Sequence, residues 1–205
     1  VIFEKVLAKF RRTAPLAAEM GILPYKSENG KWIPSPYDGN SWWTGGFWPG
    51  LMWQLYAATK DELFRTEARR CQELLTAELR TFNLLNHDTG FMYLLSCGAK
   101  HKIDGDEQSK WDTLHAASLL MGRFNPTSTP RAGFIKSWDG REQLGYAIID
   151  CMMNLSLLFW ASRETEDPRF ANIARIHADM TLRQFLRENG SVSHIIEIDP
   201  ATGAR

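Results

Sequence analysis

The sequence predicts a mainly α-helical protein in which buried helices alternate with helices that are half exposed. Residues 47–59 and 148–163 are apolar nearly all round, which is the pattern of a helix buried on every side. Residues 61–80 and 167–187 are apolar on one face and charged on the other, as expected for helices at a protein surface. This alternation predicts an inner and an outer ring of helices.

An internal repeat supports the same arrangement. The segment QLYAATKDELFRTEARR resembles LLFWASRETEDPRFANIARI, and Phe64 matches Phe170. In each copy a buried helix ends, an acidic turn follows and an Arg-bearing amphipathic helix begins, so a helical repeat is expected. Three Gly-Phe pairs also recur at similar intervals before the expected inner elements: Gly46-Phe47, Gly90-Phe91 and Gly133-Phe134. Loops at the same end of successive inner helices would surround one cavity.

The remaining segments follow in chain order. Residues 1–20 and 104–124 carry apolar side chains at helical spacing, and a loop rich in Gly, Pro, Ser and Asn occupies 21–46. An aromatic loop is expected at 131–140. Alternation of apolar and polar residues at 191–198 predicts a strand.

Length and composition indicate a globular protein with a sizeable core, expected as one domain over residues 1–205. The chain is 44% hydrophobic and 12% aromatic, and its 24 basic residues balance 24 acidic ones. A net charge of zero argues against nucleic acid or an anionic membrane as a partner. The three widely separated cysteines, Cys71, Cys97 and Cys151, favour reduced thiols and a cytoplasmic location. A periplasmic location stays open if a signal peptide has been removed.

The chain is expected to be incomplete at its C-terminus. At the spacing of the internal repeat, 205 residues supply about four helix pairs at most. A closed ring of six helix pairs requires a longer chain. The sequence also ends near DPATG, which is typical of a turn rather than of a terminal helix cap.

Two carboxylates are candidates for chemistry, and each has a structural alternative. Asp150 lies in YAIIDCMMNLSLLFW, where an ionised carboxylate must be capped, paired or shifted in pKa. It could cap the helix that begins at Cys151, or it could act as a general acid near neutral pH. Asp88 lies in HDTGF, before a short apolar element at 90–97. It could take part in the chemistry, or its side chain could form an Asx-turn.

Tryptophan and histidine supply candidate ligand-binding residues. Five of the eight Trp residues lie between Trp32 and Trp53, and clustered rings often form walls for sugars, although core packing is the alternative. Trp138 is a further candidate from its loop alone. His87 and His194 lie in loops beside the expected cavity. His115 is expected to be a core residue, and His177, in the middle of a helix, is expected to be a surface or a packing residue.

Several common functional motifs are missing from the sequence. It contains no HExxH motif and no Cys/His cluster with zinc spacing, so no metal is expected. It also lacks GxGxxG, P-loop and GxSxG motifs, which argues against the common nucleotide-binding and serine-hydrolase functions.

Four segments together resemble the unsaturated glucuronyl hydrolase family, glycoside hydrolase family 88: WWTGGFWPGLMWQLY, HDTGFMY, IIDCMMNLSLLFWAS and SVSHIIEIDPATG. The match runs in order over most of the chain and includes both Asp motifs. The fold of this family is an (α/α)6 toroid, which agrees with the inner and outer helices. The resemblance implies that this chain supplies the N-terminal part of such a toroid.

The resemblance also implies a glycosidase that acts on the 4,5-unsaturated uronic acid left at the non-reducing end by polysaccharide lyases. Protonation at C4 would leave oxocarbenium-like charge at C5, where water adds. Asp150 would be the general acid/base, and Asp88 would hold substrate hydroxyls and raise the pKa of Asp150 through like charge. Trp42, His87 and His194 match positions that contact the sugar. An unsaturated oligosaccharide is the implied partner, and no cofactor is implied.

Two other functions remain open. One is an unsaturated rhamnogalacturonyl hydrolase acting on pectin fragments, and the other is a non-catalytic, sugar-binding toroid fragment. The HDTGF and IIDCMMNL sequences favour the glucuronyl enzyme over the pectin enzyme.

Overall fold

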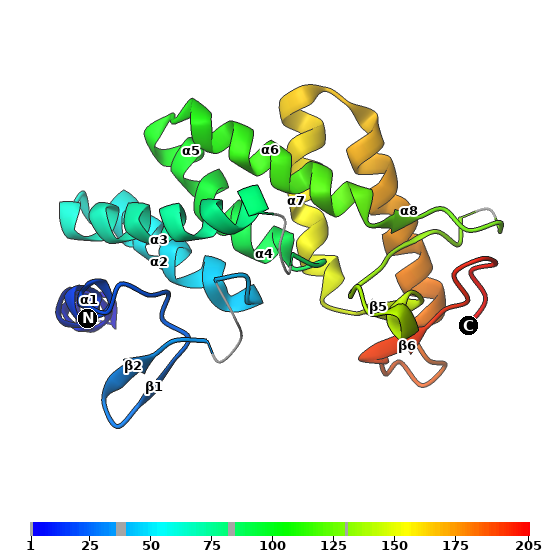
Figure 1. Ribbon diagram of the computed structural model, residues 1–205, viewed down its shortest axis with the longest axis horizontal. Coiled ribbons are helices and arrows are strands. Elements are labelled where there is room, and N and C mark those ends of the chain that lie inside the picture. The colour runs from blue at the N-terminus through cyan, green and yellow to red at the C-terminus, as the bar shows by residue number, and fades with distance from the viewer. Residues whose placement is uncertain (1, 36–39, 82–84, 130) are drawn as a thin grey trace. The chain divides into compact units, whose positions relative to one another are not determined.

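The computed structural model describes residues 2–35, 40–81, 85–129 and 131–205, and it is mainly helical (Figure 1). The chain divides into two compact units. Unit 1 comprises Val1–Leu85 and Phe91–Asp112, and unit 2 comprises Asn86–Gly90 and Thr113–Arg205. None of the helices in the described ranges is long and apolar enough to cross a membrane.

Unit 1 contains a β-hairpin and most of the helices of the first half of the chain. Its elements are α1 (Ile2–Glu19), β1 (Lys26–Glu28), β2 (Lys31–Ile33), η1 (Trp43–Gly46), α2 (Phe47–Thr59), α3 (Glu62–Thr81), the end of α4 (Thr89–Tyr93), the π-helical turn η2 (Leu94–Gly98), α5 (Ala99–Asp104) and the start of α6 (Glu107–Gly122). α3 packs on both α1 and α2.

A buried acidic residue of α3 ties this helix to α2 and, through Arg70, to the segment that follows α1. Glu67 of α3 is 2% exposed, and it accepts a hydrogen bond from Trp48 Nε1 at 2.8 Å. Arg70 pairs with the same carboxylate at 2.7 Å and donates to the carbonyl oxygen of Ile22 at 2.8 Å. Because the charge of Glu67 is both paired and hydrogen-bonded, it can remain inside the unit.

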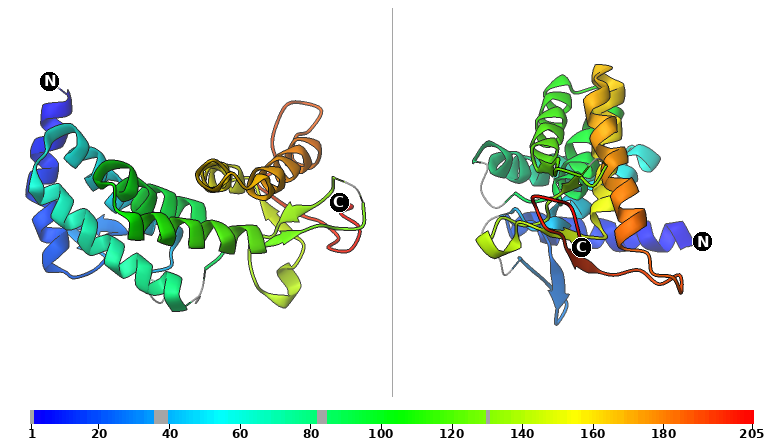
Figure 2. Two further views of the ribbon diagram at one scale, coloured as in Figure 1. Left: turned by 90° about the horizontal axis from the view of Figure 1, so that it is seen from above. Right: turned by 90° about the vertical axis from the view of Figure 1, so that its right-hand side faces the viewer.

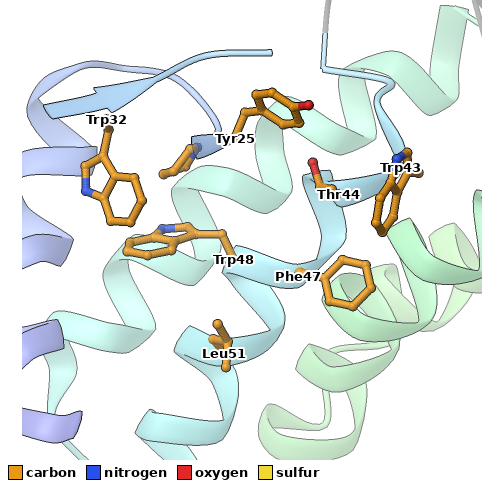
Figure 3. Close-up of a pocket in the computed structure, with 8 residues that line it drawn as sticks. Tyr25, Trp32, Trp43, Thr44, Phe47, Trp48 and Leu51 are labelled. Atoms are coloured by element: carbon orange, nitrogen blue, oxygen red, sulfur yellow. The ribbon is translucent and has the colours of Figure 1, made fainter. Parts of the chain in front are cut away.

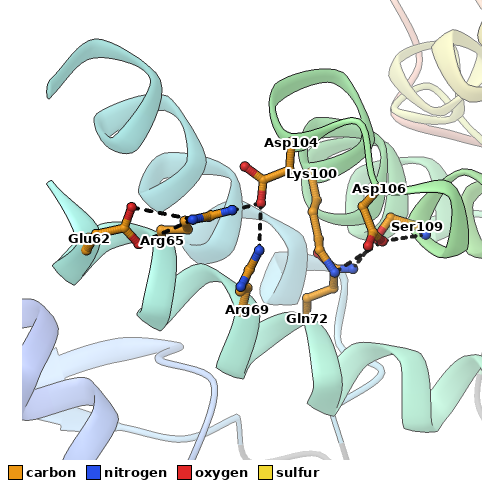
Figure 4. Close-up of polar contacts among 8 residues, drawn as sticks. All are labelled: Glu62, Arg65, Arg69, Gln72, Lys100, Asp104, Asp106 and Ser109. Carbon is orange, nitrogen blue, oxygen red and sulfur yellow. Dashed lines mark hydrogen bonds and ion pairs between the residues drawn. The ribbon is translucent and has the colours of Figure 1, made fainter. Parts of the chain in front are cut away.

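A second polar network joins α3 to α5 and α6 (Figure 4). Asp104 ends α5 and pairs with Arg65 at 3.1 Å and with Arg69 at 3.0 Å. Gln72 donates at 2.8 Å to Oγ of Ser109, which lies in the first turn of α6. These contacts fix the corner between α5 and α6, where Gly105 takes a positive φ of 69°.

Unit 2 combines a helical pair with short strands. Its elements after α6 are β3 (Phe124–Asn125), β4 (Phe134–Ile135), η3 (Arg141–Gln143), β5 (Tyr146–Ile148), α7 (Cys151–Thr165), α8 (Pro168–Gln184) and β6 (Ile195–Glu197). α7 and α8 lie side by side (Figure 2). The antiparallel pair β5–β6 packs into a core cluster of Phe134, Ala147, Met180, Phe185, Ile196 and Ile198.

Most of the predicted helices are confirmed, with local corrections. The helix predicted at 104–124 is observed as α6, Glu107–Gly122, and it begins after Gly105, where the chain turns from α5. Gly133-Phe134 leads into strand β4 rather than into an inner helix, so the third of the recurring loops was wrongly predicted. The segment 90–97 is helical, and the strand predicted within 191–198 is observed as β6. The hairpin β1–β2, inside the expected loop, was not predicted.

Gly90 provides a test of how closely α4 and α7 approach each other. A Cβ atom on Gly90 would lie 2.6 Å from both the Cα and the carbonyl oxygen of Asn154, so an alanine there must displace helical backbone. We expect Gly90→Ala to lower the free energy of unfolding by about 1–3 kcal/mol, measured by urea denaturation. Gly122→Ala is the matched control, since its Cβ would meet nothing within 4 Å. Equal stability of the two variants would contradict the observed packing.

Candidate active site

Asp88 lies in a tight turn formed by the residues around it. The side chain of Asn86 accepts a hydrogen bond from the Asp88 N–H at 2.7 Å, and Thr89 Oγ1 donates to the Asn86 carbonyl at 2.6 Å. Asn86 therefore forms the Asx-turn, and the interpretation of Asp88 as the turn-forming residue is wrong. The Asp88 carboxylate is left to interact with side chains. Because Gly90 has no side chain, this turn lies directly against α7.

Asp150 stands at the junction between β5 and α7. It occupies the N-cap position of α7, but its side chain makes no capping hydrogen bond. The alternative prediction of a purely capping role is therefore wrong. The pairing of β5 with β6 fixes the junction, because the Ile149 N–H donates to the carbonyl of His194 at 3.0 Å. The Asp150 side chain is 42% exposed, so solvent or a ligand can reach it.

A buried histidine lies between the two carboxylates. The side chain of His87 is 1% exposed, and its Nε2 lies 3.2 Å from Asp88 Oδ1 and 3.4 Å from Asp150 Oδ1. Burial lowers the pKa of His87, but contact with Asp150 and Asp88 outweighs burial and raises that pKa to about 9. His87 is therefore an imidazolium at neutral pH.

The same contact sets the ionisation of Asp150. Burial raises the pKa of Asp150, but the positive charge of His87 outweighs it and holds this pKa below its usual range, with a smaller contribution from His194. The prediction that Asp88 raises the pKa of Asp150 is wrong for the free protein, because the positively charged imidazolium lies between the two carboxylates. The free protein therefore holds Asp150 as a carboxylate.

Arg123 was missed by sequence reasoning, and it supports the loop that carries Trp138. Arg123 is 8% exposed and donates at 3.0 Å to each of three acceptors: Lys136 O, Ser137 O and Asp139 Oδ2. These acceptors flank Trp138, whose ring packs on Tyr146 at 6.1 Å. The Ser137 carbonyl also accepts the N–H of His87 at 3.4 Å. A single Arg at the end of an apolar helix carries no motif, so only the fold reveals this contact.

The other predicted histidines lie in different surroundings. His194 is exposed and has its backbone beside Ile149, which places it close to Asp150. His177 is fully buried and its Nδ1 accepts the N–H of Ile135 at 3.0 Å, so its predicted packing role is confirmed. Burial, with a further effect of His87, lowers the pKa of His177 to about 3. His115 is exposed, and its predicted core position is wrong.

The tryptophan cluster belongs to unit 1 and has two parts. Trp53 and Trp48 are buried core residues. Trp43 lines an aromatic hollow of about 310 Å³ between the β1–β2 hairpin and α2 (Figure 3). Trp42 lies beside this hollow, with ring centroids 6.4 Å from those of Tyr25 and Trp43. The role of Trp42 in sugar binding remains a prediction.

His87, Asp88 and Asp150 also carry atoms of the kind that bind metals. One ligand-type atom from each residue lies within 4.8 Å of the others, and no other such group occurs in the described part of the chain. Nε2 is protonated at neutral pH, and a protonated imidazole cannot ligate a metal. The donor set therefore fits a proton-sharing cluster better than a metal site.

Comparison with known proteins shows which enzymes the chain is similar to. No family model matches the chain. The chain is 38% identical over 168 residues to the unsaturated glucuronyl hydrolase of Bacillus sp. (strain GL1), covering 80% of this chain and 44% of that protein. It is 34% identical over 171 residues to the unsaturated chondroitin disaccharide hydrolase of Streptococcus pneumoniae, covering 82% of this chain and 42% of that protein.

Solved structures agree with the sequence comparison. The crystal structure of the Bacillus sp. GL1 unsaturated glucuronyl hydrolase matches with a TM-score of 0.84 at 34% identity, over 93% of this chain and 50% of that one. This chain is a homologue of the unsaturated glucuronyl hydrolases. The predicted fold class, part of an (α/α)6 toroid, is confirmed. The chain spans about half the length of the curated unsaturated glucuronyl hydrolases that it matches.

The support that Arg123 gives to the Trp138 loop can be tested by mutation. Arg123→Met keeps an unbranched side chain but removes the Arg123 donors to the Lys136 carbonyl and the Asp139 carboxylate, and one of the two donors to the Ser137 carbonyl. We expect the free energy of unfolding to fall by about 2 kcal/mol, measured by urea denaturation. Arg175→Met is the control, because Arg175 is exposed and its loss should cost no more than about 0.5 kcal/mol. A variant at position 123 as stable as this control would show that the three contacts contribute nothing.

Proposed function

We propose that this protein is a glycosidase that removes a 4,5-unsaturated uronic acid from the non-reducing end of lyase-generated oligosaccharides. One observation carries the proposal: Asp150 and Asp88 meet on a shared histidine, in a chain similar to unsaturated glucuronyl hydrolases. The half-exposed Asp150 is open to a ligand, whereas Asp88 and His87 are buried behind it. Asp150 is therefore the group of the cluster that is most open to the substrate.

Asp150 acts first as an acid and then as a base. Its carboxyl group donates a proton to C4 of the unsaturated sugar, and positive charge develops at C5 and the ring oxygen. Water adds at C5 and gives its proton to the Asp150 carboxylate. The product is a hemiketal, which opens and releases the rest of the saccharide. One carboxyl group serves both steps, unlike the pair that flanks the glycosidic bond in common glycosidases.

The neighbouring residues bind and orient the sugar. Asp88 accepts a hydrogen bond from a substrate hydroxyl, Trp138 offers a flat apolar face, and His194 contacts the ligand beside Asp150. Relatives support a uronic acid disaccharide as substrate. One similar enzyme is named for unsaturated chondroitin disaccharides, and a Streptococcus agalactiae variant at 26% identity was solved with dGlcA-GalNAc6S. Chondroitin-derived unsaturated disaccharides are accordingly the first substrates to use.

Loss of the conjugated C4=C5 chromophore reports this reaction directly. With unsaturated chondroitin disaccharide, we expect the wild-type protein to abolish the ultraviolet absorbance. Asp150→Asn should reduce the rate at least about 100-fold, because the general acid/base is lost. Asp179→Asn, an exposed carboxylate on α8, is the matched control and should retain the wild-type rate. A folded Asp150→Asn variant with near-wild-type turnover would refute the proposed function.

A further inference from the structure

The proposed reaction requires a protonated Asp150, yet the free protein holds it as a carboxylate. Contact with His87 keeps the pKa of Asp150 below its usual range, against the opposing effect of burial. A proton must therefore reach Asp150 before C4 can be protonated. This inference rests on the proposed function. The geometry of the cluster identifies the group that supplies the proton.

His87 is the acid in contact with Asp150. In the described part of the chain, His87 is the only cationic side chain within ion-pair distance of this carboxylate, at 3.4 Å. The same nitrogen, Nε2, also lies 3.2 Å from Asp88. Nε2 therefore lies in contact with two carboxylates, without a hydrogen bond to either in the described residues, and only one of them, Asp150, is half exposed.

We propose that His87 stores the proton that Asp150 delivers to the substrate. The Nε2–H bond breaks and an O–H bond forms on Asp150, which leaves a neutral imidazole and a neutral carboxylic acid. Asp150 then gives this proton to C4, and the water that adds at C5 returns a proton to Asp150. Asp150 passes it back to Nε2, so the cycle consumes only water and needs no further reactant.

Substrate binding supplies the reason for the transfer. Asp150 is 42% exposed in the free protein, whereas His87 is 1% exposed. A sugar that covers the cluster removes water from Asp150 alone, and loss of hydration favours the neutral acid over the carboxylate. Two ions in contact then become two neutral groups.

The other charged groups near the cluster are consistent with this role. His177 on α8 is buried and neutral at neutral pH, since its pKa is lowered to about 3 by burial and then by His87. His194 is exposed beside Asp150, and the buried guanidinium of Arg123 is committed to the loop at 136–139. In the described residues, neither ring nitrogen of His87 makes a hydrogen bond, and Nε2 meets Asp88 and Asp150 only as ion-pair contacts at 3.2 and 3.4 Å.

The dependence of kcat/KM on pH tests the proposal. The wild-type protein should lose activity as the pH rises through about 9, where His87 of the free protein gives up its proton. His87→Gln keeps an amide donor but stores no proton, so Asp150 must take one from solvent. Its kcat/KM should fall on the order of 100-fold at pH 7 and recover toward pH 5, with the alkaline limb shifted into the carboxylate range. His115→Gln, exposed on α6, should keep the wild-type profile.

The possible outcomes distinguish a failure of the proton-storing role of His87 from a failure of the proposed function. If Asp150→Asn is inactive while folded His87→Gln keeps the wild-type pH profile, the function stands and the role of His87 is refuted. A wild-type protein that turns over no unsaturated disaccharide overturns both. If His87→Gln does not fold, the wild-type profile decides, because a kcat/KM without an alkaline limb near pH 9 would contradict the proposal.

Discussion

The contact of one buried imidazole with two carboxylates is the constraint on which the candidate site depends. A lone carboxylate beside the apolar start of α7 would be driven toward its neutral form by burial, and a lone buried histidine would lose its proton. Together they keep their charges, because each ion offsets the cost of burying the others. His177 shows the contrast within the same unit: it is equally buried but has no carboxylate in contact, and its pKa falls to about 3.

The rest of unit 2 holds this contact in place. Gly90 lets the turn that carries His87 and Asp88 lie against Asn154 of α7. The β5–β6 pairing positions the residue before α7, and Arg123 holds the carbonyl that receives the His87 N–H. The contact of His87 with the two carboxylates therefore depends on main-chain positions that packing and strand pairing set.

The spacing of apolar residues was sufficient to predict the helices. Residues 47–59 and 61–80 each show a clear helical pattern of apolar positions, and tertiary contacts reinforce it. The spacing of apolar residues failed where elements of only a few residues form. The short helix α5, Ala99–Asp104, was not predicted, and the strands β1 and β2 each span three residues, too few for alternation to be visible. Asp88 and Asp150 could be selected from sequence, since motif and apolar context both marked them. The position of His87 between them could not, because it requires two segments far apart in the chain to meet.

The titration of His87 in the free protein tests this account most directly. The ring protons of His87, assigned by comparison with His87→Gln, can be followed by NMR over the range from pH 5 to about pH 10. The account predicts an apparent pKa near 9 in the wild-type protein and a lower value in Asp150→Asn, where one of the two carboxylates is gone. A wild-type His87 that titrates at or below the ordinary value of about 6.5 would contradict it.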